Sequence, residues 1–195
     1  TGGNCDRRAQ YLKAASSRLV TDLEEMVKQW TPEGEAAKAV LEDPKKGITA
    51  MLTGMGSLSY GELAGERMKL GLLLHDPEEE HDCFSDNTHN SHLNDAIGIQ
   101  QVYTGSYTRV DGSKVEGPSL SQLVAEKDAA LDKEMTAKLN RTVEAMQAMA
   151  RRAETVEAYD QMIGENNKDG NAAVQAAIDG LVDQTKTIER VISAL

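Results

Sequence analysis

The residues best suited to chemistry lie between Glu62 and Asp95. All four histidines of the chain fall in the short stretch from 75 to 92, at His75, His81, His89 and His92. The same region is rich in carboxylates, at Glu62, Glu66, Glu78, Glu79, Glu80, Asp82 and Asp86. Neutral imidazole and carboxylate are the usual protein ligands of iron and zinc. This part of the sequence is therefore the first candidate for a metal site.

The spacing of these residues allows several local arrangements. Glu78-x-x-His81 has the carboxylate–histidine spacing found in di-iron bundles, but such a site needs a second Glu-x-x-His, which the chain lacks. The alternative is a solvated acidic loop, which Pro77 favours. Asp86-x-x-His89 and His89-x-x-His92 each present two ligands on one face if that stretch is helical. The alternative is a polar helix start, capped by Ser85 or Asp86, whose histidines face water. His-Glu-x-x-His, the helix motif of many zinc proteases, is absent from the sequence.

A second polar group precedes the histidines. In an α-helix, Glu62 and Glu66 lie one turn apart on one face, and two like charges there need a cation between them. A metal ion, Arg67 or Lys69 can supply it, and the alternative is a surface ladder of ion pairs. Gly54, Gly61 and Gly65 share a face nearby, which predicts close packing of two backbones along a seam of small residues.

Composition limits the classes of function. The chain has 195 residues, with 32 acidic against 21 basic side chains and a net charge of -11. So acidic a surface repels phosphate backbones and anionic membranes, which excludes a general nucleic-acid binder. No apolar run approaches the roughly 20 residues that span a bilayer. The two cysteines, Cys5 and Cys83, form either one disulfide or two free thiols.

Hydrophobic periodicity predicts an all-α protein. Scarce aromatics, at 4%, and the abundance of strong helix formers agree with this prediction. Four long helices are expected, over residues 5–30, 47–74, 128–157 and 171–194. Shorter helices are expected over 34–42 and 86–103 and from Ser119, with an acidic loop after residue 75 and a turn-rich insertion over 104–118 around Asp111-Gly112. The prediction is an antiparallel four-helix bundle with short extra helices and a small turn-rich insertion, in a single domain over 1–195.

Several stretches resemble the imelysin family across essentially the whole chain. They are the run from Gly54 to Met68 (GMGSLSYGELAGERM), that from Glu79 to His89 (EEHDCFSDNTH), the helix start from Asn4 to Leu12 (NCDRRAQYL) and Tyr159-Asp160-Gln161-Met162-Ile163. The resemblance implies a bacterial envelope protein, periplasmic or outer-membrane-associated, connected with iron uptake. It also implies two helical bundles with a metal or ligand site between them.

The hallmark of the family, Gly-x-His-x-x-Glu, lies in its N-terminal bundle. Here the sole His-x-x-Glu is His75-Asp76-Pro77-Glu78, with Leu73 where the glycine should be. The chain therefore resembles the C-terminal half of an imelysin protein, and the resemblance makes the N-terminal bundle, as a separate or cleaved chain, its expected partner.

This half is then expected to supply one wall of the ligand cleft, with an incomplete iron or zinc site. The expected metal ligands are Glu62, Glu66, His81, Asp86 and His89, and Arg67 and Ser85 are expected to line the wall. The implied function is non-catalytic binding in iron or metal acquisition. The alternative is a metal-dependent peptidase of the insulin-cleaving type, although the chain alone has no recognisable set of nucleophile and base. An exported setting also favours a Cys5–Cys83 disulfide.

Overall fold

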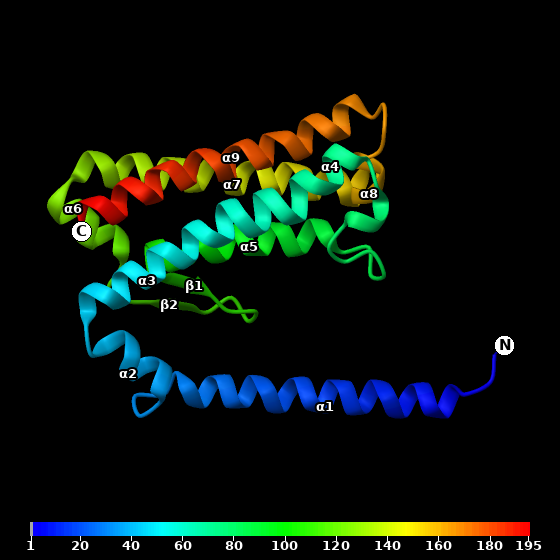
Figure 1. Cartoon of the computed structure of the whole chain (residues 1–195), viewed down its shortest axis with the longest axis horizontal. Helices are drawn as coiled ribbons and strands as arrows, with labels where there is room; N and C mark the ends of the chain where they lie inside the picture. Colours follow the sequence, from blue (N-terminus) through cyan, green and yellow to red (C-terminus); the bar gives the residue numbers. More distant parts are fainter. Residues whose placement is uncertain (1) are drawn as a thin grey trace. The chain divides into compact units, whose positions relative to one another are not determined.

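The computed structural model describes residues 2–195, which divide into two compact units (Figure 1). The boundary falls between Ile48 and Thr49. The net charge is distributed unequally between the units. Residues 1–48 carry eight acidic and eight basic side chains, so the whole charge of -11 belongs to residues 49–195. The expectation of a single domain over the whole chain stays a prediction.

The first unit consists mainly of two helices. Helix α1 (Cys5–Gln29) and helix α2 (Glu35–Leu41) are separated by a turn in which the Gly34 N–H donates to the Thr31 carbonyl at 2.8 Å. These bounds agree with the helices predicted over 5–30 and 34–42. None of the residues of α1 is buried, although the helix has a clear apolar face.

The second unit is a four-helix bundle. Its first member is a continuous rod made of α3 (Pro44–Ser57, whose first turn precedes the boundary), η1 (Leu58–Lys69) and α4 (Leu70–Leu74). The others are α5 (Thr88–Thr104), α7 (Ala129–Thr155) and α9 (Lys168–Ala194). Helix α9 packs against η1 and α7, and α5 packs against α7 and η1, which closes the ring. The predicted all-α helical bundle is confirmed.

One member of the bundle differs from the prediction. The fourth helix is α5, predicted only as a short element, whereas the long helix α1 belongs to the other unit. The reason is that α5 buries polar as well as apolar side chains: Thr88, His89 and His92 precede the buried Ala96, Ile99 and Tyr103. Hydrophobic spacing alone therefore understates how deeply this helix is packed.

The core of the bundle comes from the apolar stripes of the long helices. Met146 and Met149 of α7 and Val174, Ile178 and Leu181 of α9 are buried in it. The rod contributes Leu63, Ala64, Met68 and Leu72. Each such side chain contributes about 1.5–3 kcal/mol when fully buried, so this interior is what holds the loops at the ends of the helices in place.

The middle of the rod is a π-helix of 12 residues, Leu58–Lys69. Its wider winding is fixed to α9 by Ser59, whose hydroxyl donates to the Leu181 carbonyl at 3.0 Å and accepts from Gln184 Nε2 at 2.9 Å. The predicted glycine seam is wrong. A Cβ atom on Gly54 or Gly61 would meet nothing within 4 Å, so these glycines do not lie against another backbone.

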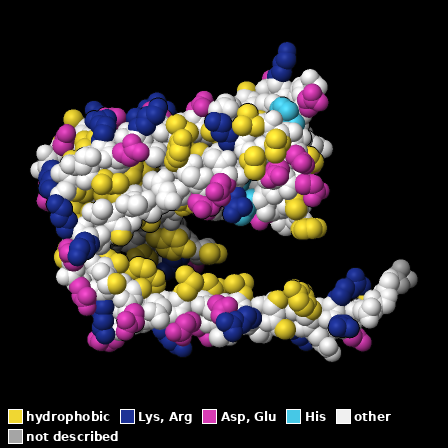
Figure 2. Space-filling view, in the orientation of Figure 1, with side chains coloured by type: hydrophobic (Ala, Val, Ile, Leu, Met, Phe, Trp, Pro, Cys, Tyr) yellow, Lys and Arg dark blue, Asp and Glu magenta, His cyan; other side chains and the backbone are white. Residues whose placement is uncertain are grey.

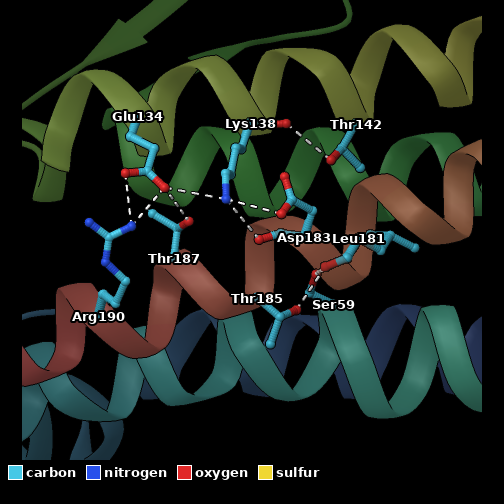
Figure 3. Close-up of polar contacts among 9 residues, drawn as sticks. All are labelled: Ser59, Glu134, Lys138, Thr142, Leu181, Asp183, Thr185, Thr187 and Arg190. Carbon is cyan, nitrogen blue, oxygen red and sulfur yellow. Dashed lines mark hydrogen bonds and ion pairs between the residues drawn. The ribbon is translucent and has the colours of Figure 1, made fainter. Parts of the chain in front are cut away.

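The close helix approach occurs elsewhere, between α9 and α7. A Cβ atom on Gly180 would lie 3.0 Å from Oγ1 and 3.2 Å from Cα of Thr142. Polar contacts hold the same two helices together (Figure 3). Lys138 Nζ lies 3.1 Å from Asp183 Oδ1 and 3.3 Å from Glu134 Oε1, and Arg190 binds both oxygens of Glu134 at 2.7 and 2.8 Å.

Short elements connect the bundle helices. After α4 come the 3₁₀ turn η2 (Pro77–Glu79) and a run of turns. The 104–118 insertion is a two-stranded antiparallel hairpin, β1 (Ser106–Thr108) with β2 (Lys114–Glu116), and its turn places Gly112 at φ 82° as the Asp-Gly signal predicts. Helix α6 (Leu120–Lys127) begins with a Ser119–Gln122 capping box, and α8 (Tyr159–Met162) precedes α9.

Candidate ligand site at the histidine cluster

Four elements of the second unit bring ionisable side chains together at one end of the bundle. They are η1, the turns after η2, the start of α5, and α8. Their electrostatic couplings and ring contacts define what we call the histidine cluster, whose members are Arg67, Glu80, His81, Asp82, His89, His92, Asp95 and Tyr159.

His92 lies at the centre of the histidine cluster. Its side chain is fully buried, and neither ring nitrogen has a hydrogen-bond partner. Its ring centroid lies 6.2 Å from that of His81 and 5.5 Å from that of Tyr159, which it meets edge-on. Burial, followed by the neighbouring His81, Arg67 and His89, lowers the pKa of His92 to about 3, and Asp82 acts in the opposite direction. The imidazole is therefore neutral, the form that binds metal ions.

The turn that carries His81 is fastened to the start of α5 through Asp82. The Asp82 backbone N–H donates to Thr88 Oγ1 at 2.9 Å, and the Ser91 hydroxyl donates to a carboxylate oxygen of Asp82. Thr88 is itself buried. The segment from Glu80 to Asn87 is thus anchored by the first turn of α5, although His81 itself is exposed.

Two carboxyl groups of the histidine cluster have pKa values raised by their surroundings. Glu80 is only 8% exposed and its Oε2 has no partner. Burial raises the pKa of Glu80, and the carboxylates of Asp160, Asp86 and Asp82 raise it as well. A hydrogen bond with Thr88 lowers it in part. Burial also raises the pKa of Asp95, whereas His81 and Arg67 favour its charged form. Tyr159 is buried with its hydroxyl unpartnered, and burial and then Glu80 raise the pKa of its phenol.

The structure places the residues predicted for the cleft wall in two groups. His81, His89 and Arg67 lie around His92. Glu62 instead faces Arg67, with Oε2 and Nη2 3.9 Å apart, and both side chains are about half exposed. This pair is five residues apart, which is the hydrogen-bond spacing of a π-helix. The prediction that Glu62 and Glu66 share one face assumed the narrower winding of an α-helix, although Arg67 was among the cations expected beside them.

The remaining predicted residues lie near the surface. Glu66, Ser85 and Asp86 are exposed, and Asp86 has a left-handed backbone with φ 54°. The Ser85 hydroxyl donates to the Asp82 carbonyl at 3.3 Å. Neither Ser85 nor Asp86 caps α5, because the helix begins at Thr88 after Asn87. Within residues 2–195, no three histidine, cysteine, aspartate or glutamate side chains converge closely enough to hold a metal ion.

Sequence reasoning did not select Glu80, Asp82, His92, Asp95 and Tyr159 for the site. A signal for His92 was present, because residues 89, 92, 96, 99 and 103 follow the 3–4 spacing of a buried helical face. Tyr159 has no such signal, since the contact with α5 crosses more than sixty residues of chain. Cys5 and Cys83 are free thiols, and no helix in residues 2–195 has the length and hydropathy to cross a membrane.

Comparison with known proteins now identifies the family. The sequence model of the imelysin family, designated peptidase family M75, matches residues 2–188. The chain belongs to the imelysin family. A search of curated proteins gives no significant match. The imelysin family carries a metallopeptidase name, which makes a metal ion plausible for this member. The histidine cluster lies within the matched residues and contains members of three of the stretches on which the resemblance rests.

Proposed function

We propose that this imelysin-family chain is a non-catalytic binding protein of the bacterial envelope, periplasmic or outer-membrane-associated, that acts in iron or metal acquisition. The observation that carries the proposal is His92, a fully buried neutral imidazole with two unpartnered nitrogens beside His81. An unsatisfied buried polar group costs about 1–3 kcal/mol, which a bound ion compensates. The cost is hard to explain if this end of the bundle is only structural.

The donors of the histidine cluster suit iron or zinc but form an incomplete site. His81 and His92 offer imidazole nitrogens, Asp95 offers a carboxylate within electrostatic range of His81, and Asp82 offers one within range of His92. A metal ion bound there would neutralise the negative charge of the surrounding carboxylates. Because three such side chains do not converge within residues 2–195, further ligands must come from a second element.

The exposed face of α1 supports a helical partner. Large apolar side chains between 51% and 77% exposed run along it and its end, at Tyr11, Leu12, Leu19, Val20, Leu23, Met26, Val27 and Trp30 (Figure 2). Their spacing is that of a helix that packs in a bundle, and so long an apolar face needs a cover in water. We infer that the occupant of this face is the N-terminal imelysin bundle.

A metal-dependent peptidase is the second candidate. The observation that favours it is Glu80, because burial raises the pKa of this carboxyl as a general base near a metal-bound water requires. Cleavage of insulin by the assembled protein, lost in Glu80→Gln, would establish this alternative. Stoichiometric metal without cleavage supports the binding function.

The deciding experiment is elemental analysis of the chain, alone and reconstituted with the N-terminal bundle. Wild type is compared with the two cluster variants His92→Phe and His81→Ala. His75→Asn is the matched control, because His75 contacts the Ile163 carbonyl at 2.7 Å and its left-handed backbone suits asparagine. We expect stoichiometric iron or zinc in wild type and in His75→Asn, and loss in the two cluster variants. Absence of metal from every preparation would refute the proposed function.

A further inference from the structure

A groove between helices α7 and α9 forms a cavity of about 400 Å³. Its floor consists of small residues, Ala145 of α7 and Ala176 and Gly180 of α9. Because these residues are small, the surface stays hollow where the helices approach most closely, at the contact of Gly180 with Thr142. We call this cavity the α7–α9 groove. None of the residues of the histidine cluster lines it, so the two sites are separate.

The two walls of the α7–α9 groove carry opposite charges. Helix α7 supplies Lys138 and Arg141, whereas α9 supplies Asp179 and Asp183. Opposite charges on facing walls produce an electric field that runs across the groove, although the four charges sum to zero. A ligand with a single charge of either sign is therefore attracted to one wall and repelled by the other.

One facing pair of charges is already closed. Lys138 Nζ lies 3.1 Å from Asp183 Oδ1, and it also lies 3.3 Å from Glu134 Oε1 (Figure 3). The Lys138 side chain is only 15% exposed, so these contacts hold it in place. This pair therefore limits the groove at one end and leaves recognition to the charges one turn away.

The other facing pair is open. Arg141 follows Lys138 by three residues and Asp179 precedes Asp183 by four, so both lie one helical turn from the closed pair. Within residues 2–195, Arg141 and Asp179 form no ion pair with each other, although both line the groove. Asp179 Oδ1 instead accepts a hydrogen bond from Gln175 Nε2 at 2.8 Å, along α9. A positive and a negative group thus face the same cavity without neutralising each other.

This arrangement fits a small molecule that carries both charges. Its carboxylate would accept two parallel hydrogen bonds from the Arg141 guanidinium, and its ammonium would donate to the Asp179 carboxylate. A short apolar stem between them would cover the small residues of the floor. We propose that the α7–α9 groove binds a small zwitterion, an amino acid or a short peptide, between Arg141 and Asp179. The proposal is independent of metal binding at the histidine cluster.

The test is titration calorimetry of the full chain with alanine and with alanyl-alanine at low ionic strength. Two blocked dipeptides keep one charge each: N-acetyl-alanyl-alanine keeps the carboxylate, and alanyl-alanine amide keeps the ammonium. We expect the zwitterion to bind, and either block to weaken binding at least about tenfold. Added salt should weaken it too, because both contacts are ionic. The tighter binder of alanine and alanyl-alanine identifies the source as an amino acid or a peptide.

Variants of the groove separate recognition from folding. Arg141→Gln should remove the preference for the dipeptide over its amide, and Asp179→Asn the preference over its acetylated form. Each variant loses one discrimination and keeps the other, which misfolding would not produce. Ala176→Leu fills the groove and should weaken binding at least about tenfold, whereas Ala172→Leu, at an exposed position one turn earlier on α9, should not. No binding of either zwitterion, equal binding of the blocked dipeptides, or binding that survives Ala176→Leu overturns the proposal.

Discussion

The ring of His92 meets the ring of Tyr159 edge-on, with centroids 5.5 Å apart, in the interior of the bundle. This contact joins α5 to α8, and through α8 to the start of α9. It places an ionisable ring in the buried interior of the bundle. The stability of the fold therefore depends on keeping that imidazole neutral.

Acid should destabilise the bundle through His92. Its pKa falls from 6.5 in the unfolded chain to about 3 in the fold, so between these values the unfolded state binds the extra proton. The contribution is complete above pH 6.5 and decreases as the pH falls towards 3, by about 1.4 kcal/mol per pH unit. Urea unfolding from pH 7 to 4 should show this slope, and His92→Phe should reduce it.

The carboxyl groups act in the opposite sense. The pKa values of Glu80 and Asp95 are raised in the fold, so the native state binds their protons more readily and acid favours it in their range. Comparing His92→Phe with wild type cancels this contribution and that of the neighbouring Asp82, His81, His89 and Arg67. An unchanged pH slope in His92→Phe would show that the imidazole is not held neutral by burial.

Two glycines should respond to alanine in opposite ways. In Gly180→Ala the new methyl group would contact Oγ1 and Cα of Thr142 at 3.0 and 3.2 Å, which forces α9 away from α7 and costs about 1–3 kcal/mol. In Gly98→Ala the methyl group meets nothing within 4 Å, and the helix gains up to about 1 kcal/mol in propensity. Urea unfolding measures both. If the Gly180→Ala protein is as stable as Gly98→Ala, then α9 and α7 can move apart at this crossing with little loss of stability.

The fold was largely predictable because its long helices carry strong apolar periodicity. Helices α7 and α9 lie where the spacing of apolar residues such as Leu131, Met135, Val174 and Ile178 predicts them. The π-helix was not predictable, since its winding depends on contacts such as that of Ser59 with α9, which local spacing does not encode. Arg67 was one of the cations that the sequence offered to Glu62, and the structure selects it through a contact whose five-residue spacing is that of the π-helix.

The candidate site was predictable only in part for the same reason. The segment that carries His81 and His89 could be located from its composition, because the histidines gather there. Burial could not be read from composition. Burial places His92, rather than Asp86, at the centre of the histidine cluster. The fold brings Tyr159 into contact with His92 from a distant part of the chain.

The ion pairs between α7 and α9 should contribute measurable coupling. Lys138 is 15% exposed and lies between Glu134 and Asp183 (Figure 3). A double-mutant cycle of Lys138→Met and Asp183→Asn should give about 0.5–1 kcal/mol of interaction, decreasing in high salt. The Arg190–Glu134 pair, which is more exposed, serves as the comparison. Zero coupling would mean that these charges position the helices without stabilising them.

The apolar face of α1 should govern association rather than stability. Leu19 and Leu23 are 60% and 51% exposed, so replacing both with serine removes little buried area from the chain itself. The unfolding of residues 49–195 should be unchanged, while binding of a hydrophobic dye should fall and affinity for the N-terminal bundle should weaken on the order of tenfold or more. Val156→Ser, which removes an apolar side chain that is 65% exposed on the other unit, is the control and should leave affinity unchanged. Equal affinity of the double variant and wild type, measured by titration calorimetry, would show that the partner does not cover this face.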